Sequence, residues 1–138
     1  MHSIKETKLL SKQIEQRVAR YNNSTVFLRP IQKSSLPITN TLRAEIRDLR
    51  QVRHTNLVAF IGACVDSPSL YIVNEFASKG SLDDILSNTD IQLDWTFRFS
   101  ILKDIAAGMN YLHHSPIMSH GRLKSSNCVI DSRWTVKV

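Results

Sequence analysis

The chain has 138 residues, of which 42% are hydrophobic, and its 18 Lys and Arg against 12 Asp and Glu give a formal net charge of +6. This length fits one modest domain and excludes a large multidomain enzyme, and the ordinary composition excludes collagen-like, low-complexity and disordered classes. No stretch approaches the ~20 consecutive apolar residues of a membrane-spanning helix. The start, MHSIKETKLL, also lacks the apolar core of a secretory signal, so we expect the chain as given to be soluble.

The predicted elements of the first half are two helices and three strands. Residues 7–20 are expected to form an amphipathic helix because their apolar residues recur four apart. An Asn-Asn-Ser turn then leads into a β-branched and aromatic strand. Thr39 or Asn40 is expected to cap the second helix. The other predicted bounds are a strand at 25–29, the capped helix to about 53, and strands at 58–65 and 70–76.

Gly80 interrupts the chain before a second half that is mostly helical. Ser81 and Asp84 form a capping-box pattern, and Asp94 is expected to cap a long helix with a broad, mostly buried apolar face. The predicted elements are helices at 82–87 and 95–113, a loop at 116–127, and strands at 128–131 and 134–138. This order indicates an α+β fold with a strand-rich first half and a helical second half.

Glu45 is an unusual residue for its predicted position. At about 100° per residue, it falls among the apolar residues of its helix. A carboxylate on a core-facing stripe is costly unless a cation pairs with it. Arg29, at the end of the preceding strand, is one candidate partner, and a local backbone group is the alternative.

The segment HGRLKSSN carries the strongest functional signal. His120, Leu123 and Asn127 match the catalytic loop H-R-D-L-x-x-x-N of protein kinases in type and spacing. A long apolar helix precedes the loop and a predicted hairpin follows it, as in that fold. The chain therefore resembles a truncated, bilobal protein-kinase-like domain. Three divisions are expected: a helical, juxtamembrane-like lead-in at 1–20, a small lobe at 21–76, and a partial large lobe at 77–138 that ends before the D-F-G position.

The chain most closely resembles the kinase-homology domain of receptor guanylate cyclases. The segments that carry this likeness are FIGACVD, GSLDDIL, DIAAGMNYLHHS and HGRLKSSNCVIDSRWTVKV. The Arg in HGRLKS and the lead-in KLLSKQIEQRVARYN resemble the guanylin/enterotoxin receptor type most. The resemblance implies a domain on the cytoplasmic side of a membrane, attached through the parent receptor. It also implies a cyclase domain in the same parent chain, which converts GTP to cyclic GMP, and a parent homodimer.

The resemblance assigns candidate nucleotide-binding residues. In TVFLR, Arg29 takes the position of the kinase lysine and Glu45 that of the helix glutamate that pairs with it. The hinge backbone at Glu75, Phe76 and Ala77 is the candidate contact for an adenine edge, and Asn127 is a weak candidate ligand for Mg²⁺. ATP with Mg²⁺ is therefore the expected regulatory ligand, and a purely structural, empty cleft is the alternative.

The departures from the kinase pattern argue against phosphate transfer. Arg122 stands where kinases place the aspartate that accepts or orients the substrate proton. A guanidinium stays protonated and cannot act as a base. Lys124 has the spacing of a phosphate-contacting lysine, but without the base a solvated side chain is the simpler interpretation. The chain also lacks a G-x-G-x-x-G motif. We predict no catalytic residue in this chain.

Two other functions remain open from the sequence. One is an active tyrosine-kinase-like protein kinase that binds ATP, and the other is a free-standing basic interaction protein. Nucleic acid is not the expected partner, because the arginines of the second predicted helix have no aromatic residues beside them. A solvated helix face, an anionic lipid surface or an acidic partner are the interpretations of those arginines. Cys64 and Cys128 lie in apolar runs, so both are expected to be free, buried thiols in a reducing compartment.

Overall fold

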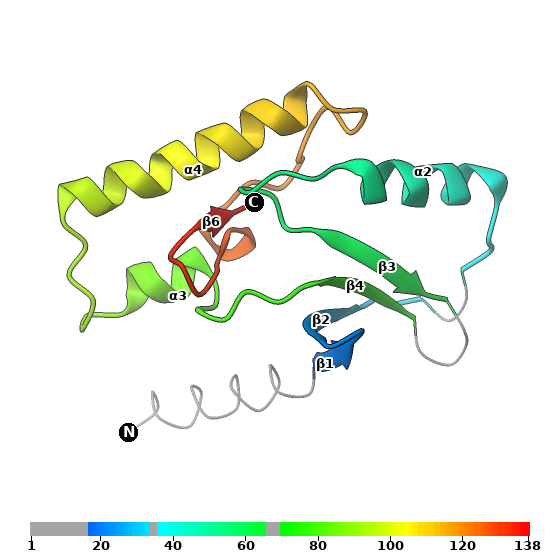
Figure 1. Ribbon diagram of the computed structural model, residues 1–138, viewed down its shortest axis with the longest axis horizontal. Helices are drawn as coiled ribbons and strands as arrows, with labels where there is room; N and C mark the ends of the chain where they lie inside the picture. Colours follow the sequence, from blue (N-terminus) through cyan, green and yellow to red (C-terminus); the bar gives the residue numbers. More distant parts are fainter. Residues whose placement is uncertain (1–16, 34–35, 66–69) are drawn as a thin grey trace. The chain divides into compact units, whose positions relative to one another are not determined.

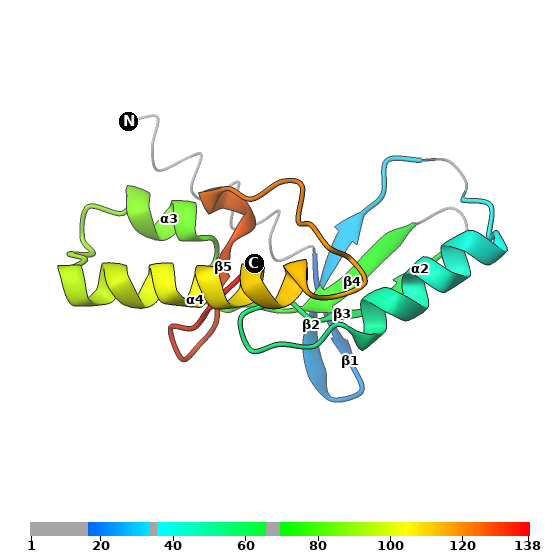
Figure 2. The same ribbon diagram turned by 90° about the horizontal axis from the view of Figure 1, so that it is seen from above.

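The computed structural model describes residues 17–33, 36–65 and 70–138. The described residues fall into two compact units. Unit 1 takes those of Met1–Pro37 and Ile61–Phe76, and unit 2 takes those of Ile38–Phe60 and Ala77–Val138. Most elements of each unit are labelled in Figure 1, and Figure 2, seen from above, also labels β5. The division differs from the expected lobes in placing residues 38–60 with the second unit.

Unit 1 is built on a four-stranded sheet. Its strands are β1 (Val18–Tyr21), β2 (Ser24–Pro30), β3 (Phe60–Cys64, of which Phe60 falls in unit 2) and β4 (Tyr71–Glu75). The strand order is β1-β2-β4-β3, and β2 pairs antiparallel with both β1 and β4. The sheet therefore places β2, which carries Arg29, between two neighbours.

The hairpin between β1 and β2 corrects part of the predicted lead-in helix. Val18 to Arg20, expected at the end of that helix, form most of β1, while residues 7–16 lie outside the described part. Asn22 and Asn23 have φ values of 45° and 64°, as a two-residue turn of type I′ requires. The Asn-Asn pair was therefore a hairpin signal, and the long-range pairing of Val18 with Phe27 overrides the local helical spacing.

Unit 2 contains three helices that begin where the sequence indicates. They are α2 (Asn40–Gln51), α3 (Leu82–Ser87) and α4 (Trp95–His113). The side chain of Thr39 accepts a hydrogen bond from the Leu42 N–H, and Asp94 accepts one from the Phe97 N–H. The capping box of α3 is complete, because Ser81 and Asp84 each accept a backbone N–H from the other. All three predicted caps are confirmed.

The core of unit 2 is one cluster of nine buried residues contributed by α3, α4, the β5–β6 hairpin and flanking loops. The hairpin consists of β5 (Val129–Ile130) and β6 (Val136–Lys137), which pair antiparallel. The cluster members are Leu57, Leu82, Ile85, Ile101, Leu112, Cys128, Ile130, Val136 and Val138. Ile130 and Val136 are fully buried. The hairpin is therefore the centre of this core.

A buried asparagine ties the loop after α2 to the end of the hairpin. Asn56 Nδ2 donates to the Val136 carbonyl at 3.0 Å, and the Asn56 carbonyl accepts from the Val138 N–H at 3.0 Å. A Cβ at Gly108 would lie 2.4 Å from the Asn56 carbonyl oxygen, so only glycine allows α4 to approach this loop so closely. These contacts explain why the segment that holds α2 belongs to unit 2.

Two burial expectations need correction. Helix α4 buries Ile101 and Leu112, but Trp95, Phe99 and Leu102 are exposed, so the helix has a second apolar face instead of being mostly buried. Cys128 is buried as predicted, whereas Cys64 is exposed because it ends β3. In the part of the chain that the structure describes, no helix is long and apolar enough to cross a membrane.

Candidate functional site

The loop His120–Asn127 connects two rigid parts of unit 2. It follows the segment that leaves α4, and it ends in a short 3-10 helix, Ser125–Asn127, immediately before the buried Cys128. Ser125 Oγ donates to Asp83 Oδ1 on α3 at 2.7 Å. Cys128, the residue before β5, also lies against the start of α3, since the Leu82 N–H donates to the Cys128 carbonyl at 2.8 Å. The packed core therefore fixes the end of the loop.

Hydrogen bonds inside the loop set its shape. His120 Nδ1 accepts from the Arg122 N–H at 3.3 Å, which places the proton of the neutral ring on Nε2. Asn127 Nδ2 donates to the Arg122 carbonyl at 2.8 Å. Gly121 has a φ of +71°, a conformation that favours glycine. His120 and Asn127 thus brace the loop from both ends, as the motif predicts for His120.

Arg122 occupies the position of the catalytic aspartate and is exposed. Its backbone makes the two loop contacts just described. Among the described residues, no carboxylate pairs with its guanidinium. Leu123 and Lys124 beside it are exposed too. The loop therefore presents permanent positive charge to solvent, and at position 122 it offers no carboxylate that could take a proton from a hydroxyl.

Arg29 and Glu45 lie on different units. Arg29 is exposed near the end of β2, opposite Ile72 of β4 in the strand register. Glu45 is in the middle of α2 and is exposed, and none of the residues of α2 is buried. The prediction that Glu45 sits on a core-facing stripe is therefore wrong, and the residue here that packs against the core of unit 2 is Val52, the C-cap residue after α2. The Arg29–Glu45 pair itself stays a prediction.

The hinge candidates follow the central strand β4. Glu75 is the last residue of β4 and lies opposite Val26 in the register, and Phe76 and Ala77 come next. All three are half-buried. Within the described ranges, the backbone groups of Phe76 and Ala77 make no hydrogen bond. These groups therefore remain available to a ligand with matching donors and acceptors.

A Mg²⁺ ion needs more oxygen ligands than this loop provides. Asn127 uses its Nδ2 inside the loop, so only its Oδ1 remains for a cation. Mg²⁺ sites in proteins normally include at least one carboxylate. The part of the chain that the structure describes holds no group of three or more His, Cys, Asp or Glu residues that could bind a metal. The described residues therefore do not make a complete Mg²⁺ site.

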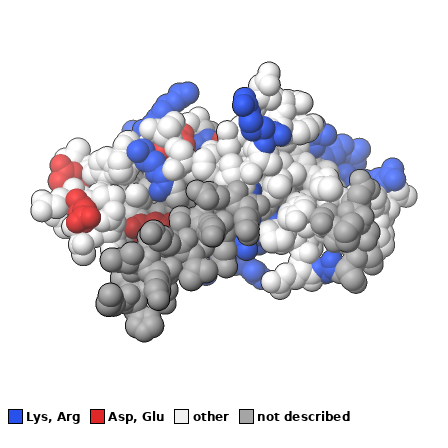
Figure 3. Space-filling model, turned by 90° about the horizontal axis from the view of Figure 1, so that it is seen from below, with Lys and Arg blue, Asp and Glu red and all other residues white. Residues whose placement is uncertain are grey.

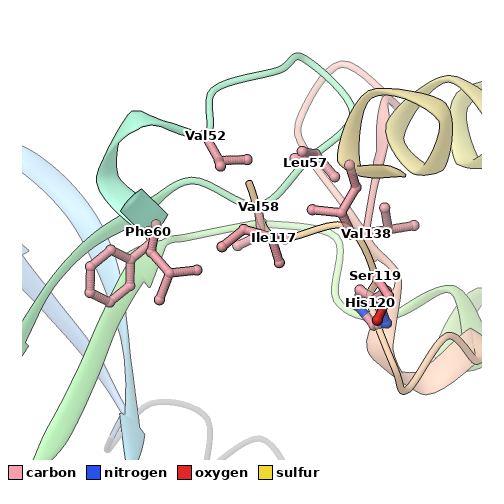
Figure 4. Close-up of a pocket in the computed structure, with 10 residues that line it drawn as sticks. Val52, Leu57, Val58, Phe60, Ile117, Ser119, His120 and Val138 are labelled. Atoms are coloured by element: carbon pink, nitrogen blue, oxygen red, sulfur yellow. The ribbon is translucent and has the colours of Figure 1, made fainter. Parts of the chain in front are cut away.

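An apolar cavity of about 180 Å³ lies in unit 2 beside the loop (Figure 4). The side chains around it come from the end of α2, the loop that follows it up to the start of β3, the end of α4, the segment after α4 and the last residue of the chain given. They are Leu49, Val52, Leu57, Val58, Phe60, Leu112, Ile117, Ser119, His120 and Val138. No Lys or Arg lines the cavity, so it does not suit phosphate groups. Sequence reasoning missed it because its lining comes from segments far apart in the chain.

Comparison with known proteins gives consistent matches. Residues 8–138 match the family described as protein tyrosine and serine/threonine kinase. Atrial natriuretic peptide receptor 2 of Anguilla japonica is 46% identical over 118 residues, which cover 86% of this chain and 11% of that protein. The speract receptor of Strongylocentrotus purpuratus is 43% identical over 91% of this chain and 11% of its own length. Guanylate cyclase 32E of Drosophila melanogaster is 45% identical over 88% of this chain and 10% of its own length. The chain thus spans about a tenth of these relatives.

Proposed function

The chain belongs to the protein tyrosine and serine/threonine kinase family, and from this premise we propose that it is a non-catalytic regulatory domain of a receptor guanylate cyclase. The resemblance to receptor guanylate cyclases and the kinase-like α+β fold are confirmed. The guanylin/enterotoxin subtype stays a prediction.

The position of Arg122 carries the proposal. The loop has the braced shape of a catalytic loop, through His120 and Asn127, yet presents a guanidinium where a proton acceptor is required. Such a domain has the fold of the kinase family but does not transfer phosphate. Its role is then to pass a conformational signal to a cyclase domain in the same chain, which makes cyclic GMP from GTP in a membrane-bound homodimer.

ATP is the proposed regulatory ligand. The free backbone groups of Phe76 and Ala77 support an adenine contact, and the exposed cation of Arg29 supports a phosphate contact. A bound Mg²⁺ would need carboxylates in addition to the residues that the structure brings together here. Binding of ATP, or a change in the predicted Arg29–Glu45 pair, alters the arrangement of the two lobes. This change alters how two cyclase domains meet in the dimer.

A phosphate-transfer assay on the full-length protein tests the first part. We expect no incorporation of radiolabelled γ-phosphate into the protein or a general substrate, and no difference between the wild type and Asn127→Ala. Transfer by the wild type that disappears in Asn127→Ala would establish the alternative, an active tyrosine-kinase-like enzyme. Arg122→Asp then shows whether the missing base is the only defect.

A thermal-shift assay tests the ATP part. We expect the melting temperature to rise with the logarithm of ATP concentration, since the ligand binds only the folded state. Arg29→Ala should remove most of this rise. Arg20→Ala is the matched control, because Arg20 is an exposed arginine on the neighbouring strand β1. Equal behaviour of both variants, or no shift in the wild type, contradicts ATP regulation through Arg29.

A further inference from the structure

Helix α2 carries a row of exposed arginines whose arrangement has no explanation inside the chain. Arg43, Arg47 and Arg50, called here the arginine stripe, follow each other at spacings of four and three residues and therefore share one helix face. Within the described residues, none of their guanidinium groups makes a hydrogen bond or an ion pair. The stripe extends over about 10 Å, given a rise of 1.5 Å per residue.

The charges of α2 are placed unfavourably for an isolated, solvated helix. The two carboxylates, Glu45 and Asp48, have no arginine three or four residues away on either side, so neither can form the usual intrahelical pair. Each stripe arginine instead has another arginine at such a spacing, and like charges there repel. The first turn also has no acidic residue to balance the positive end of the helix dipole. Of the three arginines, Arg50 lies in the last turn, where its charge balances the helix dipole. The repulsion among the three would be relieved by an external polyanion.

The shape of the stripe favours a flat anionic surface. A convex helix face cannot enclose a small anion, and none of the stripe arginines lines the cavity of unit 2. A plane of anionic groups, by contrast, reaches all three guanidinium groups at once. Ile38, just before α2, is 49% exposed and provides a shallow apolar contact of the kind found where helices lie at a lipid interface.

Unit 2 also has the charge asymmetry that would orient it on such a surface. Between residues 80 and 97, the segment of α3 and the start of α4, there are four aspartates and no Lys or Arg. Acidic side chains are visible at the end of the molecule that holds these elements, on the left in Figure 3. An anionic plane attracts α2 and repels this segment, so one orientation is preferred.

We propose that the arginine stripe of α2 binds the anionic headgroups of a lipid bilayer directly. Guanidinium groups suit phosphate and carboxylate headgroups because they donate paired hydrogen bonds. The contact holds this domain against the membrane surface in one orientation, independently of nucleotide binding and of any membrane-spanning segment elsewhere in a parent receptor.

Vesicle flotation of the full chain tests the proposal. We expect binding to phosphatidylcholine vesicles that contain phosphatidylserine, no binding to phosphatidylcholine alone, and release by high salt. The variant R43Q/R47Q/R50Q should bind about 100-fold more weakly, since each basic residue near an anionic surface contributes about fivefold. R43K/R47K/R50K should keep most of the binding because it keeps the charge.

The matched control removes three exposed basic residues away from α2, as K33Q/K103Q/R133Q. Its binding should weaken by no more than about fivefold, the effect of one surface charge. Far-UV circular dichroism checks that every variant is folded. The proposal is overturned if the wild type does not bind phosphatidylserine vesicles, or if both glutamine variants weaken binding equally.

Discussion

The two units differ in how they are held together. In unit 2, nine buried residues form one continuous core, whereas the buried apolar residues of unit 1 within the described ranges are Val26 and Leu70. Unit 1 depends instead on the backbone pairing of β2 with β1 and β4. Side-chain burial therefore stabilises the unit that carries the catalytic-like loop, and strand pairing stabilises the one that carries Arg29.

This difference also applies to the two groups of candidate residues, each of which lies on its own unit. The loop His120–Asn127 is attached to a packed core, so its geometry should vary little. Arg29 and Glu75 lie on a thin sheet with few buried side chains, and such regions open locally at lower free energy. A ligand that contacts Arg29 and Glu75 would therefore reduce local opening more in unit 1 than in unit 2.

The largest expected effect comes from truncating the centre of the unit 2 core. Ile130→Ala removes a side chain with 0% exposure and should lower the free energy of unfolding by about 2–5 kcal/mol. Urea denaturation followed by tryptophan fluorescence measures this loss, because Trp95 and Trp134 both lie in unit 2. The control Leu70→Ala, in unit 1, should leave the fluorescence midpoint nearly unchanged. Equal shifts for both variants would show that the units unfold as one.

A smaller effect is expected from filling the contact between α4 and the loop at Asn56. Gly108→Ala places a methyl group 2.4 Å from a backbone oxygen and 3.0 Å from Val138 Cγ2, and should destabilise unit 2 by about 1–3 kcal/mol. Gly62→Ala is the matched control in unit 1, since a Cβ there meets no atom within 4 Å. The same denaturation experiment applies. If Gly108→Ala leaves the free energy of unfolding unchanged, the loop at Asn56 moves away from the added methyl group without loss of stability.

The smallest effect concerns the two thiols. Burial raises the pKa of the Cys128 thiol above its ordinary value, because desolvation disfavours the thiolate. The folded state then holds this proton at a pH where the unfolded state releases it. The stabilisation is fully present below the ordinary thiol pKa of about 8.5 and is lost as pH rises toward the raised value.

Two measurements check the thiol prediction. The free energy of unfolding should fall less steeply above about pH 8.5 in Cys128→Ala than in the wild type. The variant lacks the thiol that titrates at a higher pH in the folded state than in the unfolded state. A thiol-specific reagent should modify the exposed Cys64 quickly and Cys128 only after denaturation. Rapid modification of Cys128 in the folded protein would show that its surroundings open readily.

Local signals in the sequence predicted unit 2 better than unit 1. The bounds of α3 and α4 follow from Ser81, Asp94 and the apolar periodicity, all of which act within a few residues. The helix predicted at Val18–Arg20 was wrong because these residues pair with β2, and local apolar spacing carries no information about that pairing. The exposure of Glu45 and Cys64 also depends on what the rest of the chain covers, and no local pattern contains that information.

The motif spacing singled out two loop residues whose side chains form hydrogen bonds inside the loop, but it did not indicate which atoms form them. His120 and Asn127 were expected from the frame, whereas the acceptor Nδ1 and the Arg122 carbonyl are visible only in the structure. Asn56 was not singled out, although it is buried and bonds to the strand that ends the core. A polar residue at the end of a polar segment gives no sign of its partner 80 residues away.

The bond from Asn127 has a consequence for how this loop can change. The side-chain amide of Asn127 donates to the backbone carbonyl of residue 122, and every amino acid supplies the same carbonyl there. Replacement of the side chain at that position therefore leaves the backbone contact intact. An aspartate at position 122 would therefore be held on the loop by the same Asn127 bond as the arginine is.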